Sequence, residues 1–208
     1  MPLDILLVGG TGAGKSSTVN AMAGRDIAKV GHGPSPETKK VSAYTLSDAL
    51  NLHDSAGLGE GLYADEENAR DIKKALQRSC INKGKYFRVV DLVMVILDGS
   101  SRDLGTTTAL LCDPILKQID PDRIIIAINQ ADMAMKGRGW DDITNRPSDE
   151  LKNFLKEKAI SVKARLKESL GVDFSIPVFY SAEKKYNIDV LMGMIYEKIP
   201  SQNRFVDI

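Results

Sequence analysis

The sequence predicts an α/β protein in which helices cover both faces of a doubly wound, mostly parallel six-stranded sheet with one antiparallel edge strand. Strand-length apolar runs alternate with segments of helical spacing along the chain, which is the element order of such a fold. Most of these runs are apolar throughout, as expected for strands buried on both sides. Two neighbouring strand patterns are separated only by Ser47 and Asp48, which indicates one hairpin.

The expected strands are 3–8, 41–46, 49–53, 91–97, 123–128 and 176–180. The expected helices are 17–23, 65–80, 106–119, 148–170 and 188–199. Gly24 ends the first helix, Pro114 must kink or break the third, and Pro200 follows the last. The polar stretch 25–40 is interrupted by glycines and prolines, so we expect an irregular loop of the kind that usually carries function.

Length and composition limit the classes of function that the protein can have. The 208 residues suffice for one hydrophobic core, so we expect residues 1–208 to form a single domain. Lys plus Arg and Asp plus Glu number 28 each, which excludes a strong overall field for nucleic acid or an anionic membrane. The apolar runs are too short for a transmembrane segment and no basic flank precedes them, so we expect a cytoplasmic protein. Cys80, Cys112, His32 and His53 are isolated, which indicates ordinary thiols and structural histidines.

The segment Gly9–Ser16 reads G-G-T-G-A-G-K-S and fits the phosphate-binding pattern G-x-x-x-x-G-K-[ST] at every specified position. It lies between an expected strand and an expected helix, which is the context that the motif requires. Glycines let the backbone turn N–H groups onto a phosphate, and the helix N-terminus adds favourable partial charge. A glycine-rich turn before a helix is the alternative interpretation, but the Lys-Ser pair at the correct offset favours nucleotide binding.

We expect Lys15 to bridge the β- and γ-phosphates and the Ser16 hydroxyl to ligate Mg²⁺. The residues expected to contact the nucleotide phosphates are Gly10, Thr11, Gly12, Ala13, Gly14, Lys15, Ser16 and Ser17. Kinases, ATPases, motor proteins and GTPases all have such a loop, so other segments must distinguish among these classes.

Asp54-Ser55-Ala56-Gly57 follows at the end of an expected strand. There, Asp54 can hold Mg²⁺ through water and the Gly57 N–H can meet the γ-phosphate. In the polar stretch, Thr38 is the best candidate for a switch threonine that completes the magnesium shell and contacts the γ-phosphate, with Ser35 as the alternative.

Asn129-Gln130-Ala131-Asp132 follows another expected strand and resembles the N-K-x-D guanine-recognition motif of the GTPase superfamily. Asp132 can accept hydrogen bonds from N1–H and the exocyclic amino group of guanine, whereas adenine lacks this donor pair. Asn129 can tie this loop to the phosphate loop and face the other edge of the base. Gln130 replaces the usual Lys and shortens the aliphatic stem that covers the ring, so base affinity is expected to fall while the selection by Asp132 is kept.

Ser181-Ala182-Glu183 follows the last expected strand and resembles the S-A-K segment whose backbone contacts guanine O6. The resemblance extends from Leu3 to Pro200, and all four segments occur in the order of the superfamily. With D-S-A-G-L and T-G-A-G-K-S-S-T-V-N-A-M, the sequence is similar to Era-like and septin-related P-loop GTPases of the TRAFAC class, and most similar to the bacterial ribosome-binding type.

This resemblance implies a GTP-binding switch protein that hydrolyses GTP to GDP and phosphate, with Mg²⁺ as cofactor and GTP or GDP as ligand. The catalytic residues would be Lys15, Thr38 and Gly57. The metal ligands would be Ser16, Thr38 and Asp54. The switch regions would lie around residues 31–40 and 57–70.

Hydrolysis is expected to be slow, because Leu58 stands where small GTPases place a water-orienting glutamine. A group supplied by the chain could replace it, the candidates being Glu60, Glu66, Glu67 and Arg70. A second protomer or another partner could also supply it.

Two other functions remain open. A septin-like, non-catalytic module could use GTP to hold a dimer together, and an ATP-dependent enzyme is the second rival, although Asp132 has no good role against adenine. The partners to consider are a guanine nucleotide, a nucleotide-dependent homodimer, and a ribosome or RNA. The basic and aromatic segment 82–88 is expected to be a solvated loop rather than an RNA contact, and Trp140, in an inserted loop over 133–147, is expected to pack on the domain surface.

Overall fold

The computed structural model describes residues 2–31, 41–82, 84–101 and 116–200. Its main sheet has six strands in the order β10-β7-β6-β1-β3-β2. Their bounds are β1 Leu3–Gly9, β2 Ser42–Ser47, β3 Leu50–Asp54, β6 Leu92–Asp98, β7 Ile124–Asn129 and β10 Val178–Phe179. Within this sheet β2 is antiparallel to β3 and the other pairs are parallel. The predicted fold class is confirmed.

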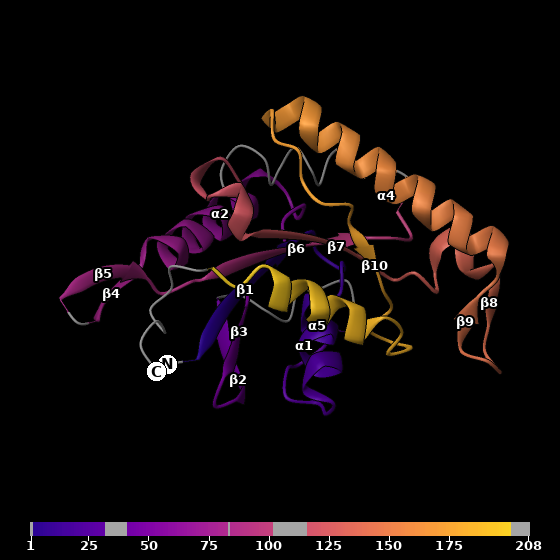
Figure 1. Cartoon of the computed structure of the whole chain (residues 1–208), viewed down its shortest axis with the longest axis horizontal. Coiled ribbons are helices and arrows are strands. Elements are labelled where there is room, and N and C mark those ends of the chain that lie inside the picture. Colours follow the sequence, from indigo (N-terminus) through magenta and orange to yellow (C-terminus); the bar gives the residue numbers. More distant parts are fainter. Residues whose placement is uncertain (1, 32–40, 83, 102–115, 201–208) are drawn as a thin grey trace.

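Helices cover both faces of the sheet, with α2 and α4 on one side and α1 and α5 on the other (Figure 1). Their bounds are α1 Lys15–Ala23, α2 Leu62–Gln77, α4 Asp149–Leu170 and α5 Ile188–Glu197. Two apolar layers result. Ile72 of α2 and Val162 of α4 belong to one buried cluster, and Val19 of α1 and Leu191 of α5 belong to the other. Burial on both faces explains why every residue of β1 is buried.

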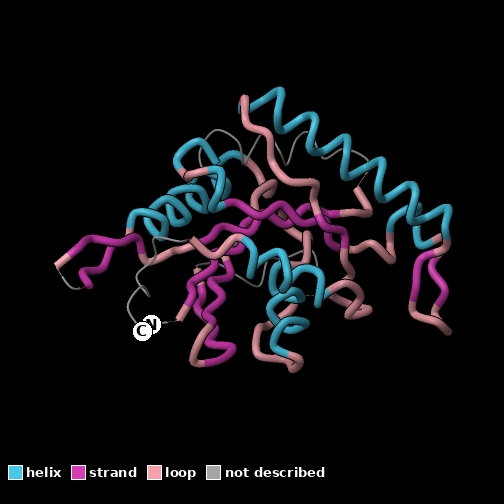
Figure 2. Tube along the Cα trace, in the orientation of Figure 1, coloured by secondary structure: helices cyan, strands magenta, loops and turns pink. Residues whose placement is uncertain are grey.

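A hairpin that the sequence analysis missed extends from the end of α2 (Figure 2). It consists of β4 (Ser79–Asn82) and β5 (Lys85–Arg88), with Ile81 opposite Tyr86. The expectations of a helix to residue 80 and of a solvated loop over 82–88 are therefore wrong. Ile81, Tyr86 and Phe87 are residue types that favour strands, and Gly84 supplies a positive φ of 76° between the two strands. Cys80 is half-buried in this hairpin, and Cys112 lies outside the described residues.

Smaller differences concern element ends. Helix α1 begins at Lys15 rather than residue 17, and β10 covers less than the expected strand 176–180. Most of the expected helix 106–119 lies outside the described residues.

The short elements are η1 Leu116–Gln118, η2 Pro121–Arg123, η3 Ala134–Gly137, β8 Trp140–Asp141 and β9 Arg146–Pro147. The inserted segment 133–147 is thus partly structured, and Trp140 packs edge-to-face on Tyr186 at a centroid distance of 5.3 Å, which agrees with surface packing.

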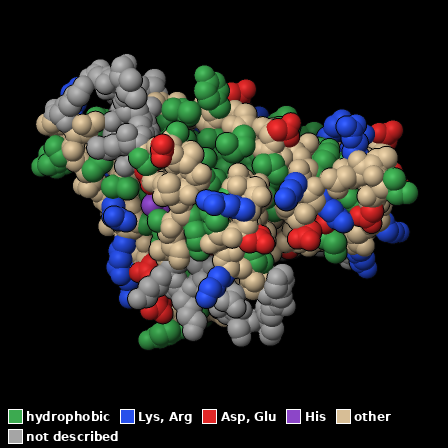
Figure 3. Space-filling view, turned by 90° about the horizontal axis from the view of Figure 1, so that it is seen from below, with side chains coloured by type: hydrophobic (Ala, Val, Ile, Leu, Met, Phe, Trp, Pro, Cys, Tyr) green, Lys and Arg blue, Asp and Glu red, His purple; other side chains and the backbone are tan. Residues whose placement is uncertain are grey.

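The remaining expectations from composition concern charge, histidines and membranes. On the face in Figure 3, basic and acidic side chains of the described residues are interspersed. The His53 Nε2 atom lies 2.6 Å from Asp4 Oδ1 in a buried contact, which supports a structural role, and His32 lies outside the described residues. No helix in the described part of the chain is long and apolar enough to cross a bilayer.

Candidate functional site

The four predicted motif segments meet at one edge of the main sheet. Gly9–Ser16 leaves the carboxyl end of β1, and 54–57 leaves the neighbouring strand β3, with Leu7 in register with Asp54. Segment 129–132 leaves β7, and 181–183 follows its neighbour β10. Doubly wound sheets bind ligands at this edge.

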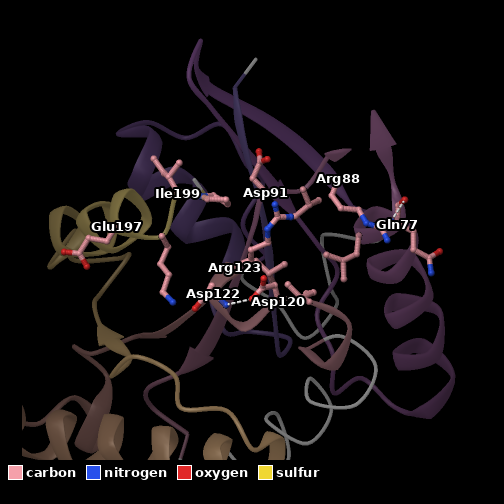
Figure 4. Close-up of a pocket in the computed structure, with 14 residues that line it drawn as sticks. Gln77, Arg88, Asp91, Asp120, Asp122, Arg123, Glu197 and Ile199 are labelled. Atoms are coloured by element: carbon pink, nitrogen blue, oxygen red, sulfur yellow. Dashed lines mark hydrogen bonds between the residues drawn. The ribbon is translucent and has the colours of Figure 1, made fainter. Parts of the chain in front are cut away.

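A separate hollow of about 1100 Å³ lies at the opposite end, around Asp91 and Arg123, the residues that precede β6 and β7 (Figure 4). None of the residues that line it belongs to the four motif segments. It is therefore distinct from the candidate site.

Backbone conformation shapes the phosphate loop. Gly12 and Gly14 take positive φ angles of 77° and 86°, which favour glycine. Space also restricts Gly14, because a Cβ atom there would lie 2.2 Å from Asn129 Nδ2. The loop leads directly into α1 at Lys15, so the backbone N–H groups of the first helical turn lie at the loop.

Lys15 carries a positive charge into this loop. Its ammonium donates to the carbonyl oxygens of Gly9 at 3.3 Å and Gly10 at 3.1 Å. The side chain is buried, and this desolvation lowers the pKa of Lys15 to about 8, while the charges of Asp54 and Glu60 act in the opposite direction. A desolvated ammonium beside N–H donors is suited to bind an anionic group.

Ser16 and Asp54 form the candidate metal site. The Ser16 hydroxyl donates to Asp54 Oδ2 at 2.6 Å, and Asp54 is fully buried. Hydroxyl and carboxylate oxygens are the hard ligands that Mg²⁺ prefers. Within the described ranges there is no cluster of three or more His, Cys, Asp or Glu side chains that could hold a metal ion. The Ser16 and Asp54 oxygens fit Mg²⁺ that keeps water in its shell.

Asn129 connects three loops. Its side-chain amide donates to the Ala13 carbonyl oxygen at 3.0 Å, and its amide oxygen accepts from the Ala182 N–H at 3.0 Å. Gln130 adds a second link to the phosphate loop, because its side-chain amide donates to the Gly12 carbonyl oxygen at 2.7 Å. The expected connection between the 129–132 loop and the phosphate loop is present.

Asp132 presents an unsatisfied acceptor at this edge. The residue is 6% exposed, and its Oδ1 atom is buried without a hydrogen-bond partner among the described residues. A buried carboxylate oxygen without a donor is costly. A ligand with N–H donors would remove this cost. Ser181 and Ala182 are also buried, whereas Glu183 is exposed.

Segment 57–58, in the second of the two predicted switch regions, contacts the phosphate loop directly, which the sequence analysis did not predict. The Leu58 N–H donates to the Gly9 carbonyl oxygen at 3.1 Å, and the Thr11 N–H donates to the Leu58 carbonyl oxygen at 2.8 Å. Gly57 lies so close that a Cβ atom there would be 2.3 Å from Thr11 Oγ1. The Leu58 side chain is 3% exposed and belongs to the apolar cluster that includes Ile72.

The sequence analysis also did not predict a buried pair of hydroxyl groups. Tyr180 Oη and Thr18 Oγ1 are 2.7 Å apart, and Thr18 Oγ1 donates to the Gly14 carbonyl oxygen at 2.7 Å. Complete burial raises the pKa of Tyr180, so the phenol stays protonated. This pair ties the residue after β10 to the first turn of α1 and supports the phosphate loop from behind. Thr38 and Ser35 lie outside the described residues.

The fold and the edge geometry together define a P-loop nucleotide-binding protein. The model of the family described as 50S ribosome-binding GTPase matches residues 4–130, which is more than half of the chain. The protein therefore belongs to this family of GTP-binding P-loop GTPases.

Solved structures share the fold. A dimerisation-deficient variant of Toc33 from Arabidopsis thaliana has a TM-score of 0.68 and 17% identity, over 97% of this chain and 86% of that one. Toc33 in complex with GDP and Mg²⁺ has a TM-score of 0.66 and 16% identity, over 97% and 85%. Era in complex with MgGDPNP and a segment of 16S ribosomal RNA has a TM-score of 0.61 and 13% identity. The chain covers 57% of that Era structure, and 96% of the chain is matched.

Proposed function

We propose that the protein is a slow GTPase whose site binds Mg²⁺ and a guanine nucleotide and switches between its GTP and GDP states. The observation that carries this proposal is the meeting, at one sheet edge, of a phosphate loop and the unpartnered Asp132 oxygen, joined through Asn129. An acceptor for N–H donors beside a cradle for phosphates matches the two ends of GDP.

In this proposal the phosphates are held by backbone N–H groups and by Lys15. The phosphate-binding residues are Gly10, Thr11, Gly12, Ala13, Gly14, Lys15, Ser16 and Ser17. Bound Mg²⁺ would neutralise charge on the β- and γ-phosphates. Ser16 would ligate it directly, Asp54 through water, and Thr38 in the GTP state.

The base would be selected by the opposite end of the site. Asp132 would accept from guanine N1–H and the exocyclic amino group, and the Ala182 N–H lies in the segment proposed to face O6. The other residues proposed to contact the base are Asn129, Gln130, Ser181 and Glu183. The Gln130 side chain donates to the Gly12 carbonyl oxygen of the phosphate loop. This contact supports a role in holding the two loops together, in addition to covering the guanine ring.

Hydrolysis would proceed by in-line attack of water on the γ-phosphate. Lys15 stabilises negative charge on the transferring group, and the N–H groups of Thr38 and Gly57 contact it. The burial of Leu58 supports a slow rate, because an aliphatic side chain packed in the core cannot orient water. Switch regions at 31–40 and 57–70 would respond to the γ-phosphate.

Calorimetry with Mg²⁺ tests the nucleotide assignment. We expect the protein to bind GDP with measurable heat and ADP much more weakly. Asp132→Asn should weaken GDP binding by at least about 100-fold, since two charge-assisted hydrogen bonds are lost. The same variant should gain affinity for xanthosine diphosphate, because the Asn amide can donate to the additional ring carbonyl. Unchanged GDP affinity in Asp132→Asn would overturn the base assignment.

A GTP-dependent homodimer is the second candidate function. Leu62 and Tyr63, at the start of α2 within the second switch region, are each 88% exposed, and exposed apolar pairs favour protein contacts. One of the structures that share the fold is a dimerisation-deficient variant of Toc33. Solution mass with a non-hydrolysable GTP analogue should double, and replacing both residues with Ser should prevent this. Ile143→Ser, at a 97% exposed site elsewhere, is the matched control. Turnover that stays constant across protein concentrations would remove the version in which a protomer completes the site.

Contact with a ribosome or RNA is supported by the family and by the β4–β5 hairpin. Lys85, Tyr86 and Arg88 are exposed on it, and basic and aromatic side chains bind single-stranded RNA. Lys85→Gln with Arg88→Gln should weaken RNA binding and reduce its salt dependence by about two counterions. RNA binding that ignores these substitutions would exclude the hairpin.

A further inference from the structure

Glu60, in the proposed switch region 57–70, contacts the phosphate loop through its side chain. The Thr11 hydroxyl donates to Glu60 Oε1 at 2.6 Å. Glu60 follows Gly57 by three positions, directly after the Leu58 backbone contacts with the loop. A carboxylate is therefore hydrogen-bonded to the loop that is proposed to hold the phosphates.

The helix that follows fixes this segment in position. Asp65 Oδ1 accepts from the Gly59 N–H at 2.7 Å and from the Glu60 N–H at 3.1 Å. Asn68 donates to the Gly57 carbonyl oxygen at 2.7 Å. Both residues belong to α2, so the contact of Glu60 with Thr11 is coupled to the position of that helix.

Glu60 also acts electrostatically on the site. Like the charge of Asp54, the charge of Glu60 opposes the lowering of the Lys15 pKa by burial. The buried Asp54 carboxylate accepts a hydrogen bond from Ser16, whereas the Glu60 side chain is exposed and can move away from the phosphate loop. The γ-phosphate of GTP is a third anion that would compete for the same ammonium.

The other acidic and basic candidates in this region lie elsewhere. Glu66 and Arg70 line a hollow together with Leu58, Leu62 and Lys73, and none of the residues that line it belongs to Gly9–Ser16. No hydrogen bond or ion pair among the described residues joins the side chain of Glu66, Glu67 or Arg70 to Gly9–Ser16. Glu60 is thus the candidate that the geometry selects.

We propose that Glu60 is a specificity-determining residue that makes the site favour GDP over GTP: its carboxylate, held by the Thr11 hydroxyl, repels the γ-phosphate and must leave before GTP binds. This inference rests on the proposed function. Departure of Glu60 would release the contact with Thr11 and so transmit the presence of the γ-phosphate to α2.

The test is the ratio of the Kd values for GDP and a non-hydrolysable GTP analogue, both with Mg²⁺. Glu60→Gln keeps the size of the side chain and removes its charge. We expect the ratio to shift toward the analogue by at least about fivefold, with GDP affinity changed by less than about twofold, because repulsion of the γ-phosphate is relieved. Glu66→Gln, on the neighbouring helix, should leave the ratio unchanged.

Thr11 supplies a second, matched pair of variants. Thr11→Val removes the hydroxyl that holds the carboxylate and should shift the ratio in the same direction as Glu60→Gln, whereas Thr11→Ser keeps the hydroxyl and should not. The double variant Thr11→Val with Glu60→Gln should shift the ratio no further than Glu60→Gln alone, because both changes remove one interaction.

Each outcome decides the question. Equal changes for both nucleotides, or an unchanged ratio in Glu60→Gln, would overturn the inference. A single-turnover hydrolysis rate that falls more than about tenfold with an unchanged ratio would instead identify a water-positioning role and also overturn it. Failure of the unmodified protein to bind either nucleotide would overturn the proposed function itself, so the two failures are distinguishable.

Discussion

The side-chain amide of Asn129 donates to the Ala13 carbonyl oxygen at 3.0 Å and so joins loops that are 116 residues apart in the sequence. The same side chain accepts from the Ala182 N–H. One buried amide thereby helps to set the distance between the proposed phosphate and base subsites, together with the link from Gln130 to Gly12. A rigid spacing of this kind reduces the ordering cost of binding a nucleotide that touches both ends.

Asn129→Ala should therefore lose both stability and affinity. Two buried backbone groups are left without partners, so we expect the free energy of unfolding to fall by about 2 kcal/mol or more. GDP affinity should fall by more than about tenfold, because the link that joins the phosphate loop to both base-side segments is lost and the spacing of the two subsites is less rigid. Denaturant titration and calorimetry measure the two effects.

Asn51→Ala is the control for this prediction. Asn51 donates to Asp4 Oδ1 at 3.1 Å near the other end of the sheet. Its loss should reduce stability and leave GDP affinity within about twofold. A comparable loss of GDP affinity in both variants would mean that destabilisation alone explains the effect at Asn129.

Lys15 predicts a pH dependence of binding. Burial lowers its pKa from 10.5 to about 8, so from about pH 8 up to about pH 10.5 the folded protein binds fewer protons at this site than the unfolded chain. The stability of the nucleotide-free protein should rise with pH across this window. A bound phosphate favours the charged form, so GDP binding should take up a proton, and GDP affinity should fall as the pH rises above about 8.

Calorimetry in two buffers of different ionisation enthalpy measures this proton uptake. Lys15→Arg keeps its charge throughout the range and should bind GDP without uptake at this site. Ionisation of guanine itself is common to both proteins, so the difference between them isolates Lys15. Identical uptake in the two proteins would contradict the prediction.

The sequence predicted the fold class and the edge of the sheet where the motif segments meet. Both could be predicted because they depend on local patterns of residues. Continuous apolar runs identified β1, β6 and β7, and the glycine pattern identified the turn into α1. The contact of Leu58 with Gly9 and Thr11 could not be predicted, because it depends on how β1 and β3 align in space. The β4–β5 hairpin was missed because its four-residue strands follow a helix without a strong breaker.

Gly14 and Gly24 separate a steric requirement from a conformational one. Both have positive φ, but a Cβ at Gly14 would lie 2.2 Å from Asn129 Nδ2, whereas one at Gly24 would meet no atom of the described residues within 4 Å. Gly14→Ala should destabilise the fold by about 2–4 kcal/mol and abolish GDP binding, because Asn129 and the loop must shift. Gly24→Ala should cost about 1 kcal/mol and leave GDP affinity unchanged. Thermal unfolding with and without GDP distinguishes the two sites; equal losses of affinity would show that φ alone matters.

Leu58 provides a test of whether the missing glutamine alone sets the rate. Its side chain is buried in the apolar cluster that includes Val8 and Ile72, so Leu58→Gln places an amide in an apolar layer. We expect the free energy of unfolding to fall by at least about 2 kcal/mol. The single-turnover hydrolysis rate should change by less than about twofold, because the new amide cannot reach the phosphate without disrupting the Leu58 backbone contacts. Leu62→Gln, at an 88% exposed site, should alter stability by less than about 0.5 kcal/mol. Hydrolysis that accelerates at least about tenfold in Leu58→Gln, with stability preserved, would mean that this segment reorients freely in the GTP state.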